Sequence, residues 1–201
     1  MNNKINKIFT YKKIFISVFI SLILVFSTLG GVTANSVNGF SGNGSGTEED
    51  PYQISTLEQL DEVRDDLTAH YKLINDIDAS PTTNWNEGKG FKPIGNDSNS
   101  FTGTFNGNKY EITGLHINRP NTNNIGLFGY IDTGGTVTNT TLKNVNVTGY
   151  RRVGGLIGWN WYGTVTDSHS TGNVTGRISV GGLIGYDAGT VTDSHSTGNV
   201  T

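Results

Sequence analysis

Two Asp-x-His pairs carry the side chains most suited to chemistry in this 201-residue chain. Asp167 and His169 form the first pair, and Asp193 and His195 repeat it 26 residues later. Imidazole and carboxylate groups can share a transition metal, or the carboxylate can tune the histidine as a general base. Zinc, however, requires three or four converging ligands. The alternative is a polar ladder on an outer face, copied by duplication, and we assign no metal ligand, catalytic residue or cofactor.

Aromatic residues form a second candidate site. Tyr130, Trp159 and Tyr186 each follow a similar Gly-Leu-x-Gly segment, and Trp161 and Tyr162 lie in the adjacent turn. Stacked rings at a turn would stabilise a repeat structure through ring contacts. An exposed row of the same rings would also suit ligand contact, for example stacking against sugars. We favour the structural role and keep these five residues as speculative ligand contacts.

Other catalytic arrangements find little support in the sequence. Glycoside hydrolysis needs two carboxylates that flank the scissile bond, yet only five acidic residues follow position 97 and none are clustered. The chain has no H-E-x-x-H or G-x-S-x-G motif, and it has no cysteine. Enzymatic activity stays open, and we lean towards a non-enzymatic protein.

The elements that position these residues repeat along the chain. Val153 to Gly158 (VGGLIG) returns as Val180 to Gly185, and Thr164 to Thr175 returns unchanged as Thr190 to Thr201. The spacing is 27 residues for the first block and 26 for the second, so the length changes only in the intervening turn. A fixed period that varies only in a loop indicates stacked structural units.

A parallel β-helix fits this period best. A weaker copy begins near residue 124, and each period contains three short strands without a helix between them. We therefore predict an all-β, right-handed parallel β-helix with about 4.8 Å between coils. A propeller blade would need roughly 40–50 residues. The predicted apolar columns are Leu127, Leu156 and Leu183; Val137, Val165 and Val191; and Val147, Val174 and Val200. We expect the paired glycines to turn corners with positive φ.

A short helix should close the first coil. Ser55 and Glu58 form a possible capping box, and Leu57, Leu60 and Val63 fall on one face. The sequence predicts a signal peptide at 1–34, a flexible leader at 35–50, a cap with the helix at 51–69, and the β-helix at 70–201. The β-helix includes repeats at about 124–149, 153–176 and 180–201.

The N-terminal segment predicts export. Lysines at positions 4, 7, 12 and 13 precede an apolar run from 14 to 26, and a small-residue cleavage pattern ends at Ala34. The residues after position 34 carry 10 basic and 17 acidic side chains. This net negative charge argues against nucleic-acid binding. We expect a secreted or cell-surface protein that meets the membrane only through its export signal.

The repeat sequence resembles the GLUG-motif family of secreted and cell-surface β-helical proteins. The match is Gly-Gly-Leu-x-Gly followed by G-T-V-T-(D/N)-S-x-S-T-G-N-V-T, as found from 154 and from 181. This resemblance implies an adhesin-like array or an accessory region of a larger secreted enzyme such as a metalloprotease. It brings no catalytic residue with it.

Partners can be predicted only as classes. We expect a module for adhesion or partner binding, with surface glycans or host and cell-surface proteins as ligands. The alternative is a carbohydrate-binding or polysaccharide-degrading β-helix. The sequence stops at Thr201 inside a predicted strand. An open strand edge at this point could pair with another chain, or the polypeptide could be longer.

Overall fold

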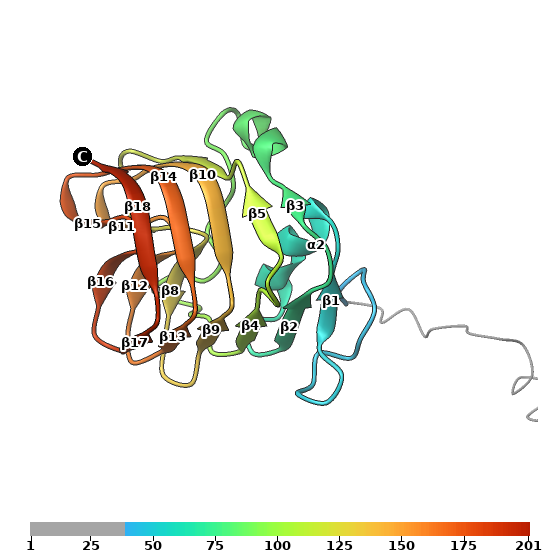
Figure 1. Cartoon of the computed structure of the whole chain (residues 1–201). Coiled ribbons are helices and arrows are strands. Elements are labelled where there is room, and N and C mark those ends of the chain that lie inside the picture. Colours follow the sequence, from blue (N-terminus) through green and yellow to red (C-terminus); the bar gives the residue numbers. More distant parts are fainter. Residues whose placement is uncertain (1–38) are drawn as a thin grey trace, which may run out of the picture. The chain divides into compact units, whose positions relative to one another are not determined.

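A computed structural model describes residues 39–201, so the predicted signal peptide lies outside the described residues. These residues form a parallel β-solenoid whose coils stack in chain order, from β1 and α2 at one end to β18 at the other (Figure 1). All pairings between the named strands are parallel. The predicted fold class is therefore confirmed.

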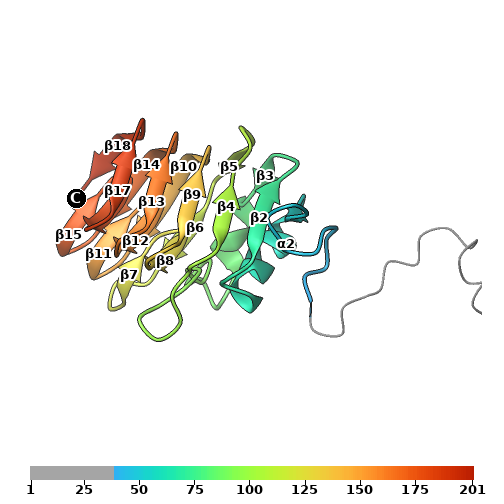
Figure 2. The ribbon, with the colours of Figure 1, turned by 90° about the horizontal axis from the view of Figure 1, so that it is seen from below.

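Four sheets form the walls of the solenoid, and their strands lie side by side in successive levels when seen from below (Figure 2). The first sheet contains β1 (Tyr52–Ile54), β2 (His70–Leu73), β4 (Thr104–Asn106), β9 (Thr136–Thr138), β13 (Thr164–Thr166) and β17 (Thr190–Thr192). The second contains β3 (Ile77–Asp78), β5 (Glu111–Thr113), β10 (Thr141–Thr148), β14 (His169–Thr175) and β18 (His195–Val200), with β6 (His116–Asn118) also pairing with β10.

The two remaining sheets have three strands each. One contains β7 (Asn123–Ile125), β11 (Arg151–Gly154) and β15 (Ile178–Gly181), and the other contains β8 (Phe128–Ile131), β12 (Ile157–Asn160) and β16 (Ile184–Asp187). The last three coils therefore have four strands each, where the sequence predicted three. The difference arises because the chain bends at Gly155 and Leu156, which separates β11 from β12.

The predicted apolar columns fill the interior except in the last coil, where Val191 and Val200 are 37% and 46% exposed. Val165 pairs with Val137 and Val191, and Val174 pairs with Val147 and Val200. Leu127 and Leu156 are fully buried, and Leu183 is nearly so. Stacking in register places like side chains over one another, so each coil covers the apolar face of the coil before it.

The paired glycines of the repeat do not take the positive φ angles that we predicted. Gly154, Gly155, Gly158 and their counterparts are absent from the left-handed residues of the described chain. They are needed for close backbone packing instead, because a Cβ on Gly154 would collide with the Ile157 carbonyl oxygen and one on Gly158 would lie 2.5 Å from the carbonyl carbon of Asn124. Two left-handed corners of the coils belong to other residues: one column contains Asn124, Arg152 and Ser179, and another contains Asn139, Asp167 and Asp193.

The N-terminal cap contains α2 (Leu57–Glu62) and a 3₁₀ turn, η1 (Val63–Asp65); a second 3₁₀ turn, η2 (Ser80–Asn84), follows β3. The helix begins one residue later than the predicted capping box. Thr56 Oγ1 accepts a hydrogen bond from Gln59 N at 3.2 Å, and Gln59 Oε1 accepts one from Ser55 N at 2.8 Å. Thr56 is thus the N-cap that we assigned to Ser55, and Gln59 reaches back to the amide of Ser55, one residue before the N-cap.

Residues 39–50 differ from the flexible leader that their composition suggested. Phe40 is 8% exposed, and its ring centre lies 4.8 Å from that of Tyr52 and 5.8 Å from that of Tyr71. The amides of Ser45 and Gly46 both donate to the Asp50 carbonyl oxygen. Burial of the Phe40 ring therefore ties this segment to the cap end of the core.

Candidate functional site

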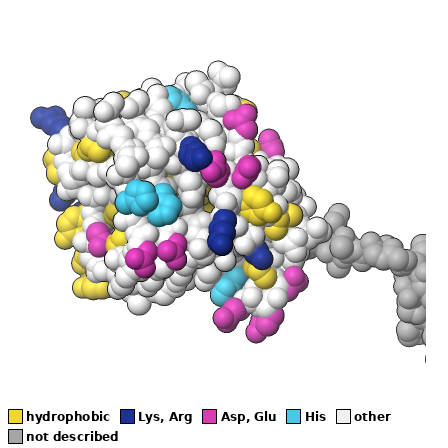
Figure 3. All heavy atoms as spheres, in the orientation of Figure 1, with side chains coloured by type: hydrophobic (Ala, Val, Ile, Leu, Met, Phe, Trp, Pro, Cys, Tyr) yellow, Lys and Arg dark blue, Asp and Glu magenta, His cyan; other side chains and the backbone are white. Residues whose placement is uncertain are grey.

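The two Asp-x-His pairs stack as predicted and form a polar ladder of Asp167, His169, Asp193 and His195. His169 pairs with His195 in neighbouring strands, and their ring centres lie 4.1 Å apart with 38° between the planes. Figure 3 shows two His side chains together on this outer face, with acidic side chains beside them. The aspartates sit at left-handed corners with φ of 48° each, a conformation that Asp and Asn tolerate better than most residues. Their backbone role thus accounts for the residue type.

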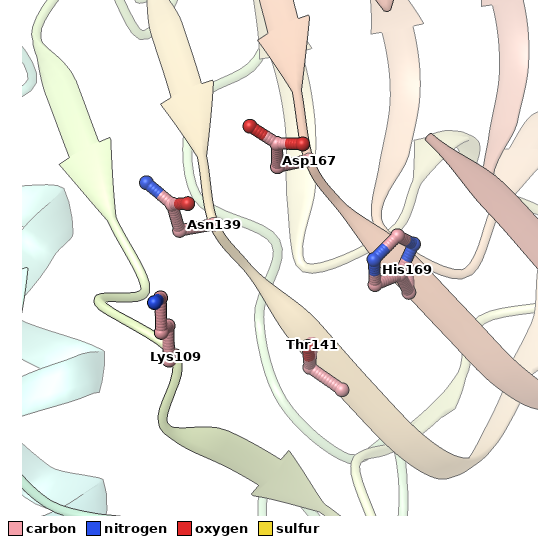
Figure 4. Close-up of a pocket in the computed structure, with 5 residues that line it drawn as sticks. All are labelled: Lys109, Asn139, Thr141, Asp167 and His169. Atoms are coloured by element: carbon pink, nitrogen blue, oxygen red, sulfur yellow. The ribbon is translucent and has the colours of Figure 1, made fainter. Parts of the chain in front are cut away.

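A shallow hollow of about 390 Å³ adjoins the polar ladder (Figure 4). It is lined by Lys109, Asn139, Thr141, Asp167 and His169. The histidine column continues into earlier coils as Thr141 and Glu111, so histidine occupies only two levels. Within residues 39–201, no three His, Asp or Glu side chains converge in a way that could hold a metal ion. The polar side chains that line the hollow can therefore form hydrogen bonds with a ligand at the surface.

Sequence reasoning missed a second column, which we call the hydroxyl ladder: Thr140, Ser168 and Ser194. Ser168 Oγ donates to the Thr166 carbonyl oxygen at 2.9 Å and accepts from Thr140 N at 3.3 Å. Ser194 Oγ repeats both contacts one coil further on. Its signal was present in the repeat, because each hydroxyl residue follows its left-handed Asn or Asp directly. This ladder satisfies buried backbone groups at a corner.

The aromatic column also forms as predicted. Trp159 pairs with Tyr130 and with Tyr186 in the neighbouring strands, with ring centres 4.7 and 6.0 Å away. Trp161 approaches the same indole edge-on, at 5.3 Å. With Tyr162, which contacts Trp161 at 4.8 Å, these five residues make one continuous cluster, the aromatic face.

Trp159 is the centre of the aromatic face, and its ring contacts three aromatic rings and one guanidinium group. The Arg152 guanidinium lies 3.7 Å from the centre of its ring, a cation–π contact. Arg152 also donates to Asn124 Oδ1 at 3.2 Å, and Asn124 Nδ2 donates to Asp97 Oδ1 at 2.6 Å. Arg152, Asn124 and Asp97 escaped the sequence analysis, although Asn124 and Arg152 occupy equivalent left-handed positions 28 residues apart. These contacts hold the Trp159 indole in place.

The exposed part of the aromatic face lies at the turn after β12. Tyr162 is 59% exposed and Tyr186 is 44% exposed, whereas Tyr130, Trp159 and Trp161 are half-buried. Tyr162 is the extra residue that makes this turn longer than the next one, where Ala188 is followed directly by Gly189. Its φ is 62°, which is unusual for a bulky side chain.

Carboxylates as well as the Arg152 guanidinium lie near the aromatic face. Burial raises the pKa of the Tyr130 hydroxyl, and the nearby carboxylates of Asp132 and Asp97 raise it further. Asp187 follows Tyr186 and pairs with Asn160 of the preceding coil. Its Oδ1 accepts from Asn160 Nδ2 at 2.6 Å. Carboxylates thus lie in the coils on both sides of the Trp161–Tyr162 turn.

Fold and surface together define a β-solenoid repeat protein with an aromatic side wall. Residues 149–175 match the family model described as the GLUG motif. The chain therefore carries a GLUG motif over these residues. Within the described part of the chain, no helix is both long enough and apolar enough to cross a bilayer.

Two curated relatives cover most of this chain but are much longer. Halomucin of Haloquadratum walsbyi is 44% identical over 137 residues, which is 64% of this chain and 2% of that protein. A protein of Evansella cellulosilytica named "Putative Gly-rich membrane protein" is 37% identical over 155 residues, which is 75% of this chain and 18% of that protein. The chain thus spans less than a fifth of either relative.

One solved structure has a distant likeness. It is described as the crystal structure of a putative immunoglobulin A1 protease from Bacteroides ovatus, with 17% identity and a TM-score of 0.39. The match covers 78% of this chain and 69% of that chain. A likeness at this level carries no argument about activity.

Proposed function

We propose that this chain is an exported, non-enzymatic β-solenoid module that is displayed at the cell surface or secreted, and that it binds a partner through the aromatic face. The GLUG repeats build the scaffold, and the turn after β12 presents the contact residues. Adhesion to a glycan or to a cell-surface protein is the activity that this arrangement supports best.

The conformation of Tyr162 carries the proposal. A bulky residue in the left-handed region costs of order 1–3 kcal/mol, and Tyr162 places its ring in solvent, where burial returns little of that cost. The other non-glycine residues with left-handed backbone in the repeats are Asn124, Asn139, Asn144, Arg152, Asp167, Ser179 and Asp193, and none of them is aromatic. A strained, exposed aromatic residue is typical of a contact site.

The relatives support a surface location for the module. One is named a halomucin and the other a membrane protein, and the apolar segment from 14 to 26 has the composition of an export signal. Antibody labelling of intact producing cells tests this part. Signal from intact cells or from the medium is expected, and signal only after lysis would contradict it.

Binding is tested with the labelled full chain on arrays that carry both glycans and cell-surface proteins. The wild type should bind at least one class of ligand, and Tyr162→Gly should weaken that binding by at least about tenfold. Ile74→Ser is the matched control, because Ile74 is 38% exposed and lies at the cap end. Equal loss in both variants, or new reducing or unsaturated ends on a bound polysaccharide, would overturn the proposal.

A further inference from the structure

We propose that the ligand of the aromatic face is a neutral glycan, which stacks on the rings of Trp161 and Tyr162 and donates hydroxyl hydrogen bonds to Asp187. This inference rests on the proposed function, because it assigns a ligand class to the same surface. Sugars present an apolar C–H face and a rim of hydroxyl groups, so their site needs an exposed ring beside fixed hydrogen-bond acceptors.

The rings meet the first requirement. Trp161 and Tyr162 are consecutive in one turn, and their planes are inclined at 61° with the centres 4.8 Å apart. Two inclined rings form a corner, and a pyranose ring can stack on one wall while its neighbour contacts the other. Tyr186, 44% exposed, extends the surface to the next coil. Trp159 contributes from behind, because Arg152 already covers its face.

Asp187 meets the second requirement. Its Oδ1 accepts hydrogen bonds from Asn160 Nδ2 at 2.6 Å and from Gly189 N at 3.3 Å. Asn160 is fully buried, so its amide holds the carboxylate in one orientation. The Asp187 side chain itself is exposed. A carboxylate fixed in this way can accept from sugar hydroxyls without first losing side-chain entropy.

Local charge selects neutral sugars over acidic ones. Asp132 occupies the turn of the preceding coil and Asp187 the turn of the following coil, so the rings lie between two carboxylates. Arg152, the cation that contacts this face, is already engaged with Trp159 and Asn124. Uronic or sialic acids would meet like charge here, which disfavours them.

The test is native electrophoresis of the full chain in gels that contain one polysaccharide each. Galactomannan and xyloglucan are the neutral probes, and polygalacturonate is the acidic probe. We expect the neutral probes to retard the wild type and polygalacturonate to have little effect. Trp161→Ala, Tyr162→Gly and Asp187→Ala should each raise the Kd for a neutral probe by at least about tenfold, with Ile74→Ser unchanged.

The outcomes separate this inference from the proposed function. Stronger retardation by polygalacturonate, or none by the neutral probes, would overturn the assignment of neutral glycans. If the chain still bound an arrayed protein in a manner that depends on Tyr162, the proposed function would stand, and only the assignment of neutral glycans would fall. If the neutral probes retard all three variants as they retard the wild type, the aromatic face is not the binding site, and both the proposed function and this inference would be contradicted. Thermal unfolding of each variant confirms that the loss is not a folding defect.

Discussion

The α-carbon of Gly158 packs directly against the backbone of Asn124 in the preceding coil, so closely that a Cβ would lie 2.5 Å from the Asn124 carbonyl carbon. Gly185 repeats this approach one coil later, against Arg152 and Val153. The walls built by β11 and β12 therefore meet backbone to backbone, with no side chain between them at these points. This contact explains the second half of the Gly-Gly-Leu-x-Gly pattern in steric terms.

Gly158→Ala should lower the free energy of unfolding by about 3 kcal/mol or more, because the obstructing atoms are backbone and cannot rotate away. Urea denaturation measures the change. Gly88→Ala is the control, since no atom lies within 4 Å of its Cβ position and only its φ of 79° opposes the substitution. That conformational cost is about 1–2 kcal/mol. Similar losses in the two variants would contradict the steric explanation.

Removing one rung of the hydroxyl ladder should cost about 1–3 kcal/mol. Ser168→Ala takes away the acceptor of the Thr140 amide, which then lies buried without a partner. Ser168→Thr should cost less than about 1 kcal/mol, since threonine already fills the equivalent position at Thr140. Chemical denaturation distinguishes the two. Equal stability of the alanine variant and the wild type would show that the ladder adds nothing.

Ionisation of the Tyr71 hydroxyl should lower the free energy of unfolding at alkaline pH. Its hydroxyl donates to the Asp66 carbonyl oxygen at 2.7 Å, and burial, followed by the charge of Asp66, raises its pKa above the ordinary value of 10.0. The folded state holds the proton more tightly than the unfolded state. The resulting stability is complete below pH 10 and declines as the pH rises from there through the raised pKa.

Comparison with Tyr71→Phe isolates this effect. The variant lacks the titrating group, so its deficit relative to the wild type should be about 1 kcal/mol at pH 8 and should shrink as the pH rises beyond 10. Urea midpoints measured from pH 8 to 11 supply the comparison. A deficit that stays constant across this range would rule out linkage through Tyr71.

Tyr162→Gly should change the free energy of unfolding by less than about 1 kcal/mol. Relief of the left-handed conformation gains about 1–2 kcal/mol, which offsets the lost contact with Trp161 and the added flexibility of the unfolded chain. Tyr186→Gly has no such relief, because Tyr186 lies in β16, and it should cost about 1–2 kcal/mol. A loss above 2 kcal/mol for Tyr162→Gly would mark this residue as structural.

The repeating sequence predicted the solenoid and its interior well, because stacking in register makes contacts follow directly from spacing. Val165 contacts its counterparts 28 and 26 residues away, as a period alone requires. The same logic correctly paired His169 with His195 and Trp159 with Tyr186. The sequence is enough to predict a contact where one coil repeats the sequence of its neighbour.

Details within a coil depend on geometry that the period does not encode. The bend that separates β11 from β12 changed three strands into four, and it gave Gly154 a packing role in place of a turning role. The sequence also does not show which aromatic rings are exposed. Trp159 and Tyr162 lie three residues apart, yet Arg152 covers the ring of Trp159 while Tyr162 lies in solvent. Phe40 was missed because its burial partners, Tyr52 and Tyr71, are far along the chain.

The stacking of coils also sets how the solenoid would respond to tension. Each repeat of 26 or 27 residues adds only about 4.8 Å to the length of the folded body. The same residues, once detached and drawn out, would span about 90 Å. A force that peels one coil from β14 and its neighbours would thus lengthen the chain nearly twentyfold at that level. A surface module built in this way can absorb mechanical load one coil at a time.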